Sequence, residues 1–286
     1  MYASSRFLRQ TALAFTLLAT LLIAAGAEAG AHRSNFKLPP PPENLSFDEN
    51  YVPTVLITGS NRGIGLAFAQ RYAEQGWRVI ATCRKPAEAE ALQALAGQYP
   101  DTVIVEQLDV ADFDQVDALA AKYRGEPVDV LLNNAGISGG SGNQVFGKMD
   151  FEVFADVLRV NTIAPLKVSE AFFENVQASR EKKIMTVSSS QGSIGMVEQP
   201  RLYFYRASKA AQNMDMKNLS LQLKRRGITV GMVNPGMTDT DFKAGLHKRM
   251  LRPPVDAADD MKRNIDSMTV ETTGGFIQYD GEELPW

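Results

Sequence analysis

Apolar and polar positions follow a repeating pattern from residue 52 to the end of the chain. Short apolar, β-branched runs predict strands at residues 52–58, 78–82, 102–108, 128–132, 184–187, 228–233 and 273–278. Apolar positions at helical spacing predict helices between them, at residues 66–75, 87–96, 112–123, 149–178 and 205–226. Because the first four strands are each followed by a helix, without a hairpin, the pattern predicts an α/β fold. That fold is a single doubly wound domain with a central parallel sheet flanked by helices.

A glycine-rich turn joins the first predicted strand to the first predicted helix. It reads Gly59-x-x-x-Gly63-x-Gly65. Glycines let the backbone approach a pyrophosphate, and the N-terminus of the following helix supplies N–H groups and a positive dipole. The turn therefore predicts a dinucleotide site, with a plain strand-to-helix turn as the alternative. The residues assigned to the dinucleotide here are Gly59, Asn61, Arg62, Gly63, Ile64 and Gly65.

The end of the second predicted strand indicates which dinucleotide is preferred. Sites for NAD(H) place an acidic residue there to bind the adenosine ribose, but this sequence has Arg84 followed by Lys85. A guanidinium can bind a 2′-phosphate through two hydrogen bonds, whereas a carboxylate would repel it. Arg84, with Arg62 as a second cation, therefore favours NADP(H) over NAD(H). The alternative is that these cations are simply solvated.

A tyrosine and a lysine four residues apart form the chemical centre of the sequence. Tyr205 and Lys209 share one face of a predicted helix. A neighbouring ammonium stabilises a phenolate and lowers the tyrosine pKa, which makes the phenol a usable proton donor and acceptor. Upstream, Ser188, Ser189 and Ser190 follow a predicted strand and offer a hydroxyl.

Composition narrows the classes of partner. The formal net charge of −3 gives no indication of nucleic-acid binding. The single Cys83 excludes an internal disulfide, and the two histidines, His32 and His247, leave no metal cluster. Composition therefore gives no indication of a nucleic acid or a metal as a partner, and it leaves a homo-oligomer open.

The first thirty residues have the features of a targeting segment. Arg6 and Arg9 precede an uncharged run at residues 11–25, and Ala27-Glu28-Ala29 offers a cleavage site. This predicts a signal peptide or a membrane anchor at residues 1–29, a proline-rich linker at 30–50 and the catalytic domain at 51–286. The protein is then exported (periplasmic or secreted) or membrane-anchored. A cytoplasmic location is the alternative, because a dinucleotide is a cytosolic-type cofactor and the start site can be misassigned.

Several motifs together resemble the short-chain dehydrogenase/reductase family over about residues 52–286. They are Thr58-Gly59-x-x-x-Gly63-x-Gly65, Asn133-Asn134-Ala135-Gly136, the serine block, Tyr205-x-x-x-Lys209 and Pro235-Gly236. The wording at residues 205–213 and the ending at 279–286 are similar to the carbonyl-reductase-like and C-factor-like branch. The resemblance implies a Rossmann-type domain that transfers hydride between NADP(H) and a carbonyl or alcohol substrate. The alternative within this branch is a dinucleotide-binding signalling or regulatory protein with incidental activity.

The resemblance also implies catalytic roles. Tyr205 would be the general acid in carbonyl reduction, and Lys209 would lower its pKa and hold the nicotinamide ribose. Ser189 fits the catalytic serine, since Gly192 follows it at the family's spacing, and it would hydrogen-bond the substrate oxygen. Asn161 matches the asparagine whose backbone carbonyl holds a relay water. Pro165, which cannot donate to that carbonyl in a helix, is consistent with this role or with a simple kink.

The remaining implied contacts lie at the ends of the predicted strands. Asp109 would meet the adenine, Asn133 would support the adenine side and the central strand, and Thr240 would contact the carboxamide. The other residues assigned to the cofactor are Ala135, Tyr205, Lys209, Pro235, Gly236 and Thr238. Residues 237–260 are expected to form a lid over the site. The cations of this lid suit either an acidic substrate or, preferably, a solvated helix face: Lys243, His247, Lys248, Arg249 and Arg252.

Overall fold

The computed structural model describes residues 38–40, 42, 45–240 and 251–286. The chain divides into a unit over residues 1–40 and a unit over residues 41–286, and the second unit contains all the elements described below. The predicted signal or anchor segment lies outside the described residues, so it stays a prediction. None of the helices in the described part of the chain combines the length and the apolarity that a bilayer crossing requires.

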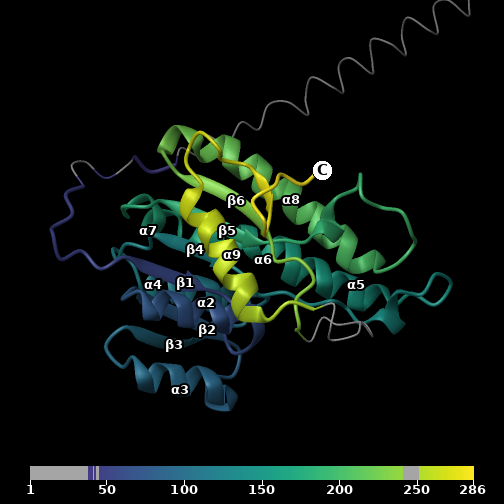
Figure 1. Ribbon diagram of the computed structural model, residues 1–286, viewed down its shortest axis with the longest axis horizontal. Coiled ribbons are helices and arrows are strands. Elements are labelled where there is room, and N and C mark those ends of the chain that lie inside the picture. Colours follow the sequence, from purple (N-terminus) through teal and green to yellow (C-terminus); the bar gives the residue numbers. More distant parts are fainter. Residues whose placement is uncertain (1–37, 41, 43–44, 241–250) are drawn as a thin grey trace, which may run out of the picture. The chain divides into compact units, whose positions relative to one another are not determined.

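A parallel sheet forms the centre of the domain (Figure 1). Within the described residues it has seven strands in the order β3-β2-β1-β4-β5-β6-β7. Their bounds are β1 Thr54–Ile57, β2 Arg78–Cys83, β3 Val103–Gln107, β4 Val130–Asn133, β5 Lys183–Val187, β6 Thr229–Asn234 and β7 Phe276–Gln278. The order reverses between β1 and β4, which is where ligands bind in doubly wound sheets. The predicted α/β fold is confirmed.

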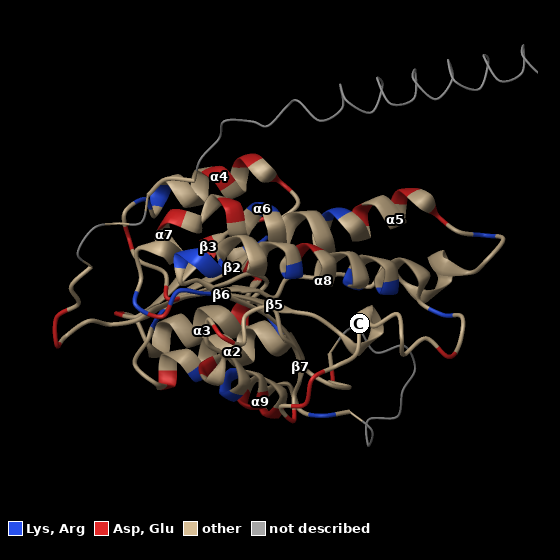
Figure 2. Ribbon diagram, turned by 90° about the horizontal axis from the view of Figure 1, so that it is seen from above, with Lys and Arg blue, Asp and Glu red and all other residues tan. Residues whose placement is uncertain are grey.

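Helices cover both faces of the sheet, as Figure 2 shows from above. One face carries α2 Gly63–Glu74, α3 Glu90–Gln98 and α9 Pro254–Ser267. The other carries α4 Phe113–Lys122, α5 Phe151–Leu158, α6 Ala164–Ala171, α7 Phe173–Gln177 and α8 Tyr203–Leu223. Every residue of β1 is buried, as are all those of β5 and β6. Cover on both faces explains why these strands are mostly apolar and do not alternate between apolar and polar residues.

The helix predicted at residues 149–178 is confirmed as an almost continuous helical stretch over residues 151–177, interrupted by one turn at residue 172. A π-helical turn, Arg159–Ile163, separates α5 from α6, and α7 follows as a separate helix. Pro165, in the first turn of α6, has no N–H to donate to the carbonyl of Asn161. The missing α-helical donor is a physical reason for the changed hydrogen-bond register at this place.

The predicted lid at residues 237–260 is wrong in its second half. Residues from Pro254 onward belong to α9, which packs on α2 through buried Ala257 and Met261. Arg252 forms an ion pair with Asp260 and is therefore not a solvated cation that faces a substrate. The other expected lid cations, at residues 243–249, lie outside the described residues.

A buried carboxylate fixes the point at which the chain enters the domain. Both oxygens of Asp129, which immediately precedes β4, are hydrogen-bonded. Oδ2 accepts from the Tyr51 hydroxyl at 2.6 Å and from the Thr54 N–H at 2.8 Å. Oδ1 accepts from the backbone N–H groups of Arg180 and Glu181, each at 3.1 Å. Burial and the carboxylate raise the pKa of Tyr51. All these groups lie at the edge where the strands begin, opposite the glycine turn.

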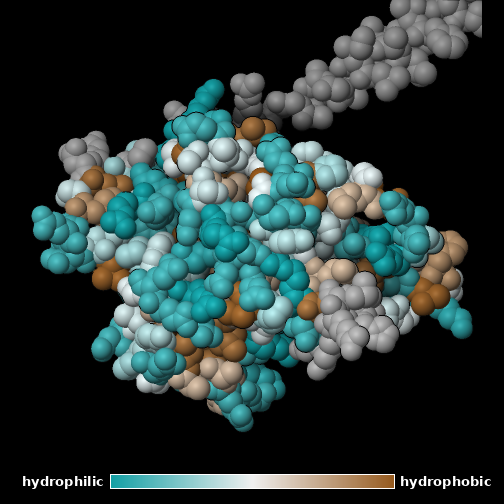
Figure 3. All heavy atoms as spheres, in the orientation of Figure 1, coloured by the Kyte–Doolittle hydropathy of each residue, from teal (hydrophilic) through white to brown (hydrophobic). Residues whose placement is uncertain are grey.

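The face of the molecule in Figure 3 is mainly hydrophilic, with separate small hydrophobic patches. Among the described residues, the large exposed apolar side chains include Phe146 and Ile194, which are 83% and 75% exposed. Both lie on loops that follow the carboxyl ends of strands, β4 and β5. These loops border the site described next.

Candidate active site

The glycine turn after β1 has a backbone conformation that favours glycine. Gly59 and Gly63 have φ angles of +71° and +55°, in the left-handed region. A Cβ on Gly65 would overlap the carbonyl oxygen of Gly59 and would lie 2.5 Å from Nδ2 of Asn134. The N-cap of α2, Arg62, makes no side-chain capping bond, so no side chain caps the first turn at that position. The turn is therefore built to let an anion approach the helix N-terminus.

Two polar residues hold this turn in place. Asn134 donates from Nδ2 to the carbonyls of Thr58 at 2.9 Å and Gly59 at 3.0 Å. The Thr58 hydroxyl accepts from the backbone N–H groups of Asn134 and Ala135, both at 3.0 Å. Both residues belong to motifs recognised in the sequence, but no role was predicted for either of them. Asn133 instead turns its buried side chain to Ser169 of α6, 3.2 Å away.

The ends of β2 and β3 lie at the same edge as the glycine turn. Arg84 follows β2, is exposed, and has no hydrogen bond or ion pair with another described residue. Its neighbour Lys85 pairs with Glu88 at 3.0 Å, which leaves Arg84 as the available cation. Asp109, after β3, is half-buried and accepts from the N–H of Ala111 at 3.0 Å.

The segment after β6 reaches the glycine turn. Gly236 has a φ of +73°, and the Thr238 hydroxyl donates to the carbonyl of Pro235 at 3.3 Å. The methyl group of Thr240 lies 3.3 Å from the position that a Cβ on Gly63 would occupy. Asn61 and Ile64, within the turn, are half-buried. The predicted cofactor residues come from five strand ends, those of β1, β2, β3, β4 and β6, and therefore lie along one edge of the sheet.

The structure distinguishes the three serines after β5. Ser188 is buried and donates to Oδ1 of Asn213 at 2.6 Å. Ser189, by contrast, hydrogen-bonds the hydroxyl of Tyr205 and lowers its pKa. A Cβ on Gly192 would lie 2.9 Å from the backbone carbon of Lys209. The glycine thus lets the serine turn pack directly on α8, which is a physical reason for the spacing between the serine and the glycine.

Burial dominates the electrostatics of the tyrosine and the lysine. It raises the pKa of Tyr205 to about 12, against the opposing effect of Ser189. It lowers the pKa of Lys209 to about 7. Nζ of Lys209 donates to the carbonyl of Val187 at 2.8 Å and to Oε1 of Gln212 at 2.9 Å, and lies 5.9 Å from the Tyr205 ring centroid. The lowered tyrosine pKa expected from the lysine is therefore not found in this arrangement, because burial disfavours both charged forms.

Asn161 lies in the π-helical turn and ties α8 to the loop after β4. Its Nδ2 donates to the carbonyl of Ile137 at 2.8 Å and to Oγ of Ser208 at 2.9 Å. Its Oδ1 accepts from the N–H of Ile137 at 2.8 Å. The side chain is thus fully used in positioning. The backbone carbonyl is the group from which Pro165 withholds the α-helical donor.

A buried glutamine that the sequence analysis did not identify positions the first turn of α8. Nε2 of Gln144 donates to the carbonyls of Ser138 at 2.7 Å and Gly140 at 2.9 Å. Its Oε1 accepts from the N–H of Phe204 at 2.8 Å, just before Tyr205. No sequence pattern marks Gln144, because its partner on α8 lies far along the chain.

The chain is similar to known proteins in sequence and in fold. A family model described as short chain dehydrogenase matches residues 53–250. The chain is similar to 1-hydroxy-2-glutathionyl-2-methyl-3-butene dehydrogenase of Rhodococcus sp. (strain AD45). The two are 32% identical over 241 residues, which cover 82% of this chain and all (100%) of the relative. It is also similar to C-signal of Myxococcus xanthus, with 34% identity over 160 residues, 56% of this chain and 93% of the relative.

Solved structures show the same relationship. The fold matches an NADPH-bound carbonyl reductase from chicken fatty liver with a TM-score of 0.76 and 30% sequence identity. The match covers 82% of this chain and 99% of that one. The family predicted from the motifs is confirmed. This chain belongs to the short-chain dehydrogenase family of oxidoreductases.

Proposed function

We propose that the protein is an NADP(H)-dependent oxidoreductase that reduces the carbonyl of a small-molecule substrate, or oxidises the corresponding alcohol. One observation carries this proposal. Ser189 hydrogen-bonds Tyr205, and Lys209 lies on the next turn of α8. Ser189 follows β5, which ends at the same edge of the sheet as the glycine turn. A proton-transfer group thus stands beside a dinucleotide cradle.

The residues present fit a phosphorylated dinucleotide. The glycine turn has no room for a Cβ at Gly65, which is the shape expected where a pyrophosphate meets backbone. Arg84 would hold a 2′-phosphate, and Arg62 stands at the first turn of α2. The chicken relative is described as NADPH-bound, which supports the same cofactor here. The chemistry that the cofactor supplies when bound is hydride transfer to the carbonyl carbon.

The protein's own residues would handle the proton. With a pKa of about 12, Tyr205 is protonated at neutral pH and can donate to the developing substrate oxyanion. Ser189 would hydrogen-bond the same oxygen. Lys209 is partly protonated near pH 7, and its ammonium would stabilise the phenolate that proton donation leaves behind. The carbonyl of Asn161 would accept a hydrogen bond from a relay water.

The test compares wild-type protein with Tyr205→Phe in an assay of NADPH oxidation with a panel of aldehydes and ketones. Loss of a general acid predicts that kcat/KM falls about a thousandfold. Tyr99→Phe is the matched control, because Tyr99 ends α3 and takes no part in the site. Equal NADPH oxidation by wild type and Tyr205→Phe would overturn the proposal. So would a protein that binds NADPH and turns over no carbonyl.

The last outcome describes the alternative, a dinucleotide-binding signalling protein with incidental activity. The similarity to C-signal is the observation behind it. It is not favoured, because a pure binder has no use for a serine hydrogen-bonded to a buried tyrosine. The same assay therefore decides between the two.

For the location, we propose that residues 1–29 export the protein or anchor it to a membrane. The basic start, the uncharged run and the small residues at 27–29 support this. N-terminal sequencing of the protein from cell fractions would find a start near residue 30 in an exported fraction if the segment is cleaved. An intact N-terminus confined to the cytoplasmic fraction would contradict both forms of the proposal.

A further inference from the structure

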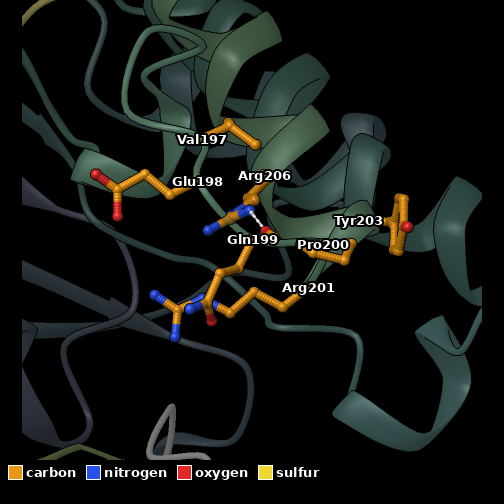
Figure 4. Close-up of a pocket in the computed structure, with 7 residues that line it drawn as sticks. All are labelled: Val197, Glu198, Gln199, Pro200, Arg201, Tyr203 and Arg206. Carbon is orange, nitrogen blue, oxygen red and sulfur yellow. Dashed lines mark hydrogen bonds between the residues drawn. The ribbon is translucent and has the colours of Figure 1, made fainter.

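A pocket of about 470 Å³ opens beside the first turn of α8 (Figure 4). A second hollow of about 460 Å³ adjoins it, since four residues line both: Glu198, Gln199, Arg201 and Arg206. The second hollow extends to Ser190 and Gln191, which follow the catalytic serine directly. The two hollows thus adjoin the segment that follows Ser189 and the residue that follows Tyr205.

One of its two arginines is fixed in position. Arg206 follows Tyr205 on α8, and its Nε donates to Oε1 of Gln191 at 2.8 Å. Its Nη1 donates to the carbonyl of Gln199 at 2.6 Å, the bond drawn in Figure 4. Both acceptors are neutral, and no carboxylate in the described part of the chain pairs with this guanidinium. Arg206 is therefore a positioned charge without a counter-ion.

The second arginine is unpaired. Arg201 is exposed and has no hydrogen bond or ion pair with any residue that the structure describes. Its charge, after burial itself, lowers the pKa of Arg206, so the two guanidinium groups repel each other. Glu198 lines the same hollows but forms an ion pair with neither arginine among the described contacts. Two guanidinium groups that share a pocket without a paired carboxylate would be stabilised by a bound anion.

We propose that this pocket binds a carboxylate of the carbonyl substrate through Arg201 and Arg206, so that the enzyme prefers aldehydes or ketones that carry an acid group. This inference rests on the proposed function. Val197, Pro200 and Tyr203 supply an apolar part of the lining. They suit a hydrocarbon spacer between the acid group and the carbonyl. Arg201 and Arg206 lie outside residues 237–260, the segment that the sequence predicted as a lid.

Binding is measured first, without turnover. Tyr205→Phe saturated with NADPH is titrated by calorimetry with 3- and 4-carboxybenzaldehyde and with their methyl esters. The charged hydrogen bonds predict that at least one acid binds about tenfold more tightly than its ester. Added salt should reduce this advantage, since the lining arginine is exposed. In the same background, Arg201→Gln should bring acid and ester close to equal affinity, and Arg201→Lys should keep part of the difference.

Arg225→Gln is the matched control, because Arg225 is an exposed arginine on the turn after α8 and away from the pocket. It should leave the acid-to-ester ratio unchanged. Equal affinity of acids and esters, no binding of either, or an acid advantage that survives Arg201→Gln overturns the pocket proposal. Thermal unfolding of each variant identifies any that fails to fold.

Steady-state assays of the wild type separate this inference from the proposed function. If acids and esters are reduced equally well, the reductase function stands and the carboxylate pocket is overturned. If neither probe is reduced while the acid still binds through Arg201, the pocket stands and the failure lies with the proposed reduction. A preference for the acids that depends on Arg201 in both assays supports both.

Discussion

The cofactor edge and the substrate side of the active site are built in different ways. The cofactor edge, residues 58–65 with 133–135, consists largely of backbone: left-handed glycines and carbonyls that Asn134 holds. The substrate side, residues 194–201, presents exposed side chains to solvent, among them Ile194 and Arg201. In the first region a change of residue alters the path of the chain. In the second it alters only what the surface offers to a ligand.

This difference predicts that the two regions tolerate substitutions differently. Backbone contacts accept few residue types, because a Cβ at Gly65 meets main-chain atoms that cannot move independently. Exposed side chains such as Arg201 carry no packing constraint and can change freely. Substrate specificity is therefore expected to vary where the cofactor edge stays fixed. The following changes test this contrast, from the largest expected effect to the smallest.

The largest effect is expected at Gly65. Gly65→Ala places a methyl group against the Gly59 carbonyl, so the turn must shift. The expected result is NADPH binding about a hundredfold weaker, equivalent to roughly 3 kcal/mol, by fluorescence titration. Gly97→Ala is the control: it lies within α3, nothing is within 4 Å of its added Cβ, and alanine favours a helix. Unchanged NADPH affinity in Gly65→Ala would break the contrast.

Lys209, where the two regions meet, gives a pH-dependent effect on stability. Its pKa is about 7 when folded against 10.5 ordinarily, so between these values the unfolded chain binds a proton that the folded protein lacks. The free energy of unfolding therefore rises with pH in this window, and Lys209→Met removes that rise. From pH 7 to pH 9 the wild type should gain about 2 kcal/mol relative to Lys209→Met, by urea unfolding. The same difference at both pH values would contradict the lowered pKa.

A substitution of Gln144 tests whether the loop at residues 138–144 positions Tyr205. Gln144→Leu removes the acceptor of the Phe204 N–H and the donor to two loop carbonyls. We expect about 1–3 kcal/mol less stability by urea unfolding, with kcat reduced more than NADPH affinity. Gln93→Leu is the control, since Gln93 is exposed and makes one bond, to the Pro86 carbonyl. A larger loss of NADPH affinity than of kcat would place Gln144 functionally with the cofactor edge.

The smallest effect is expected at Arg84, an exposed side chain that follows β2 beside the cofactor edge. Arg84→Gln should weaken NADPH binding about tenfold and leave NADH binding nearly unchanged, because only NADPH carries the 2′-phosphate. Lys85→Gln removes the same charge one residue away, but from a lysine already paired with Glu88. It should therefore have little effect. An equal loss for NADPH and NADH in Arg84→Gln would overturn the phosphate contact.

The sequence predicted those parts of the protein that depend on short-range patterns. The sheet, the glycine turn and the pair Tyr205 and Lys209 follow from apolar runs, glycine spacing and helical periodicity within a few residues. The sequence indicated only part of the irregularity in the helix predicted at residues 149–178. Pro165 indicated a kink, but the π-helical turn depends on how the chain around Asn161 packs.

Features that depend on distant contacts were not predictable. Gln144 has no local signature, since its role exists only once α8 has folded against the loop. The pKa of Tyr205 was expected to fall because the lysine was considered alone. The fold adds burial, which raises the pKa of Tyr205 and lowers the pKa of Lys209. The spacing of ionisable residues is visible in the sequence, but the extent of their desolvation depends on the tertiary structure.

The carboxylate of Asp129 has a practical consequence for handling the protein. Because it holds Tyr51 at the edge where the strands begin, the chain joins the domain on the side away from Ser189 and Tyr205. A probe attached near residue 50 would therefore lie on the side of the domain away from these two groups. Asp129 thus makes residues 45–51 a suitable attachment point for surface-coupled forms of this oxidoreductase.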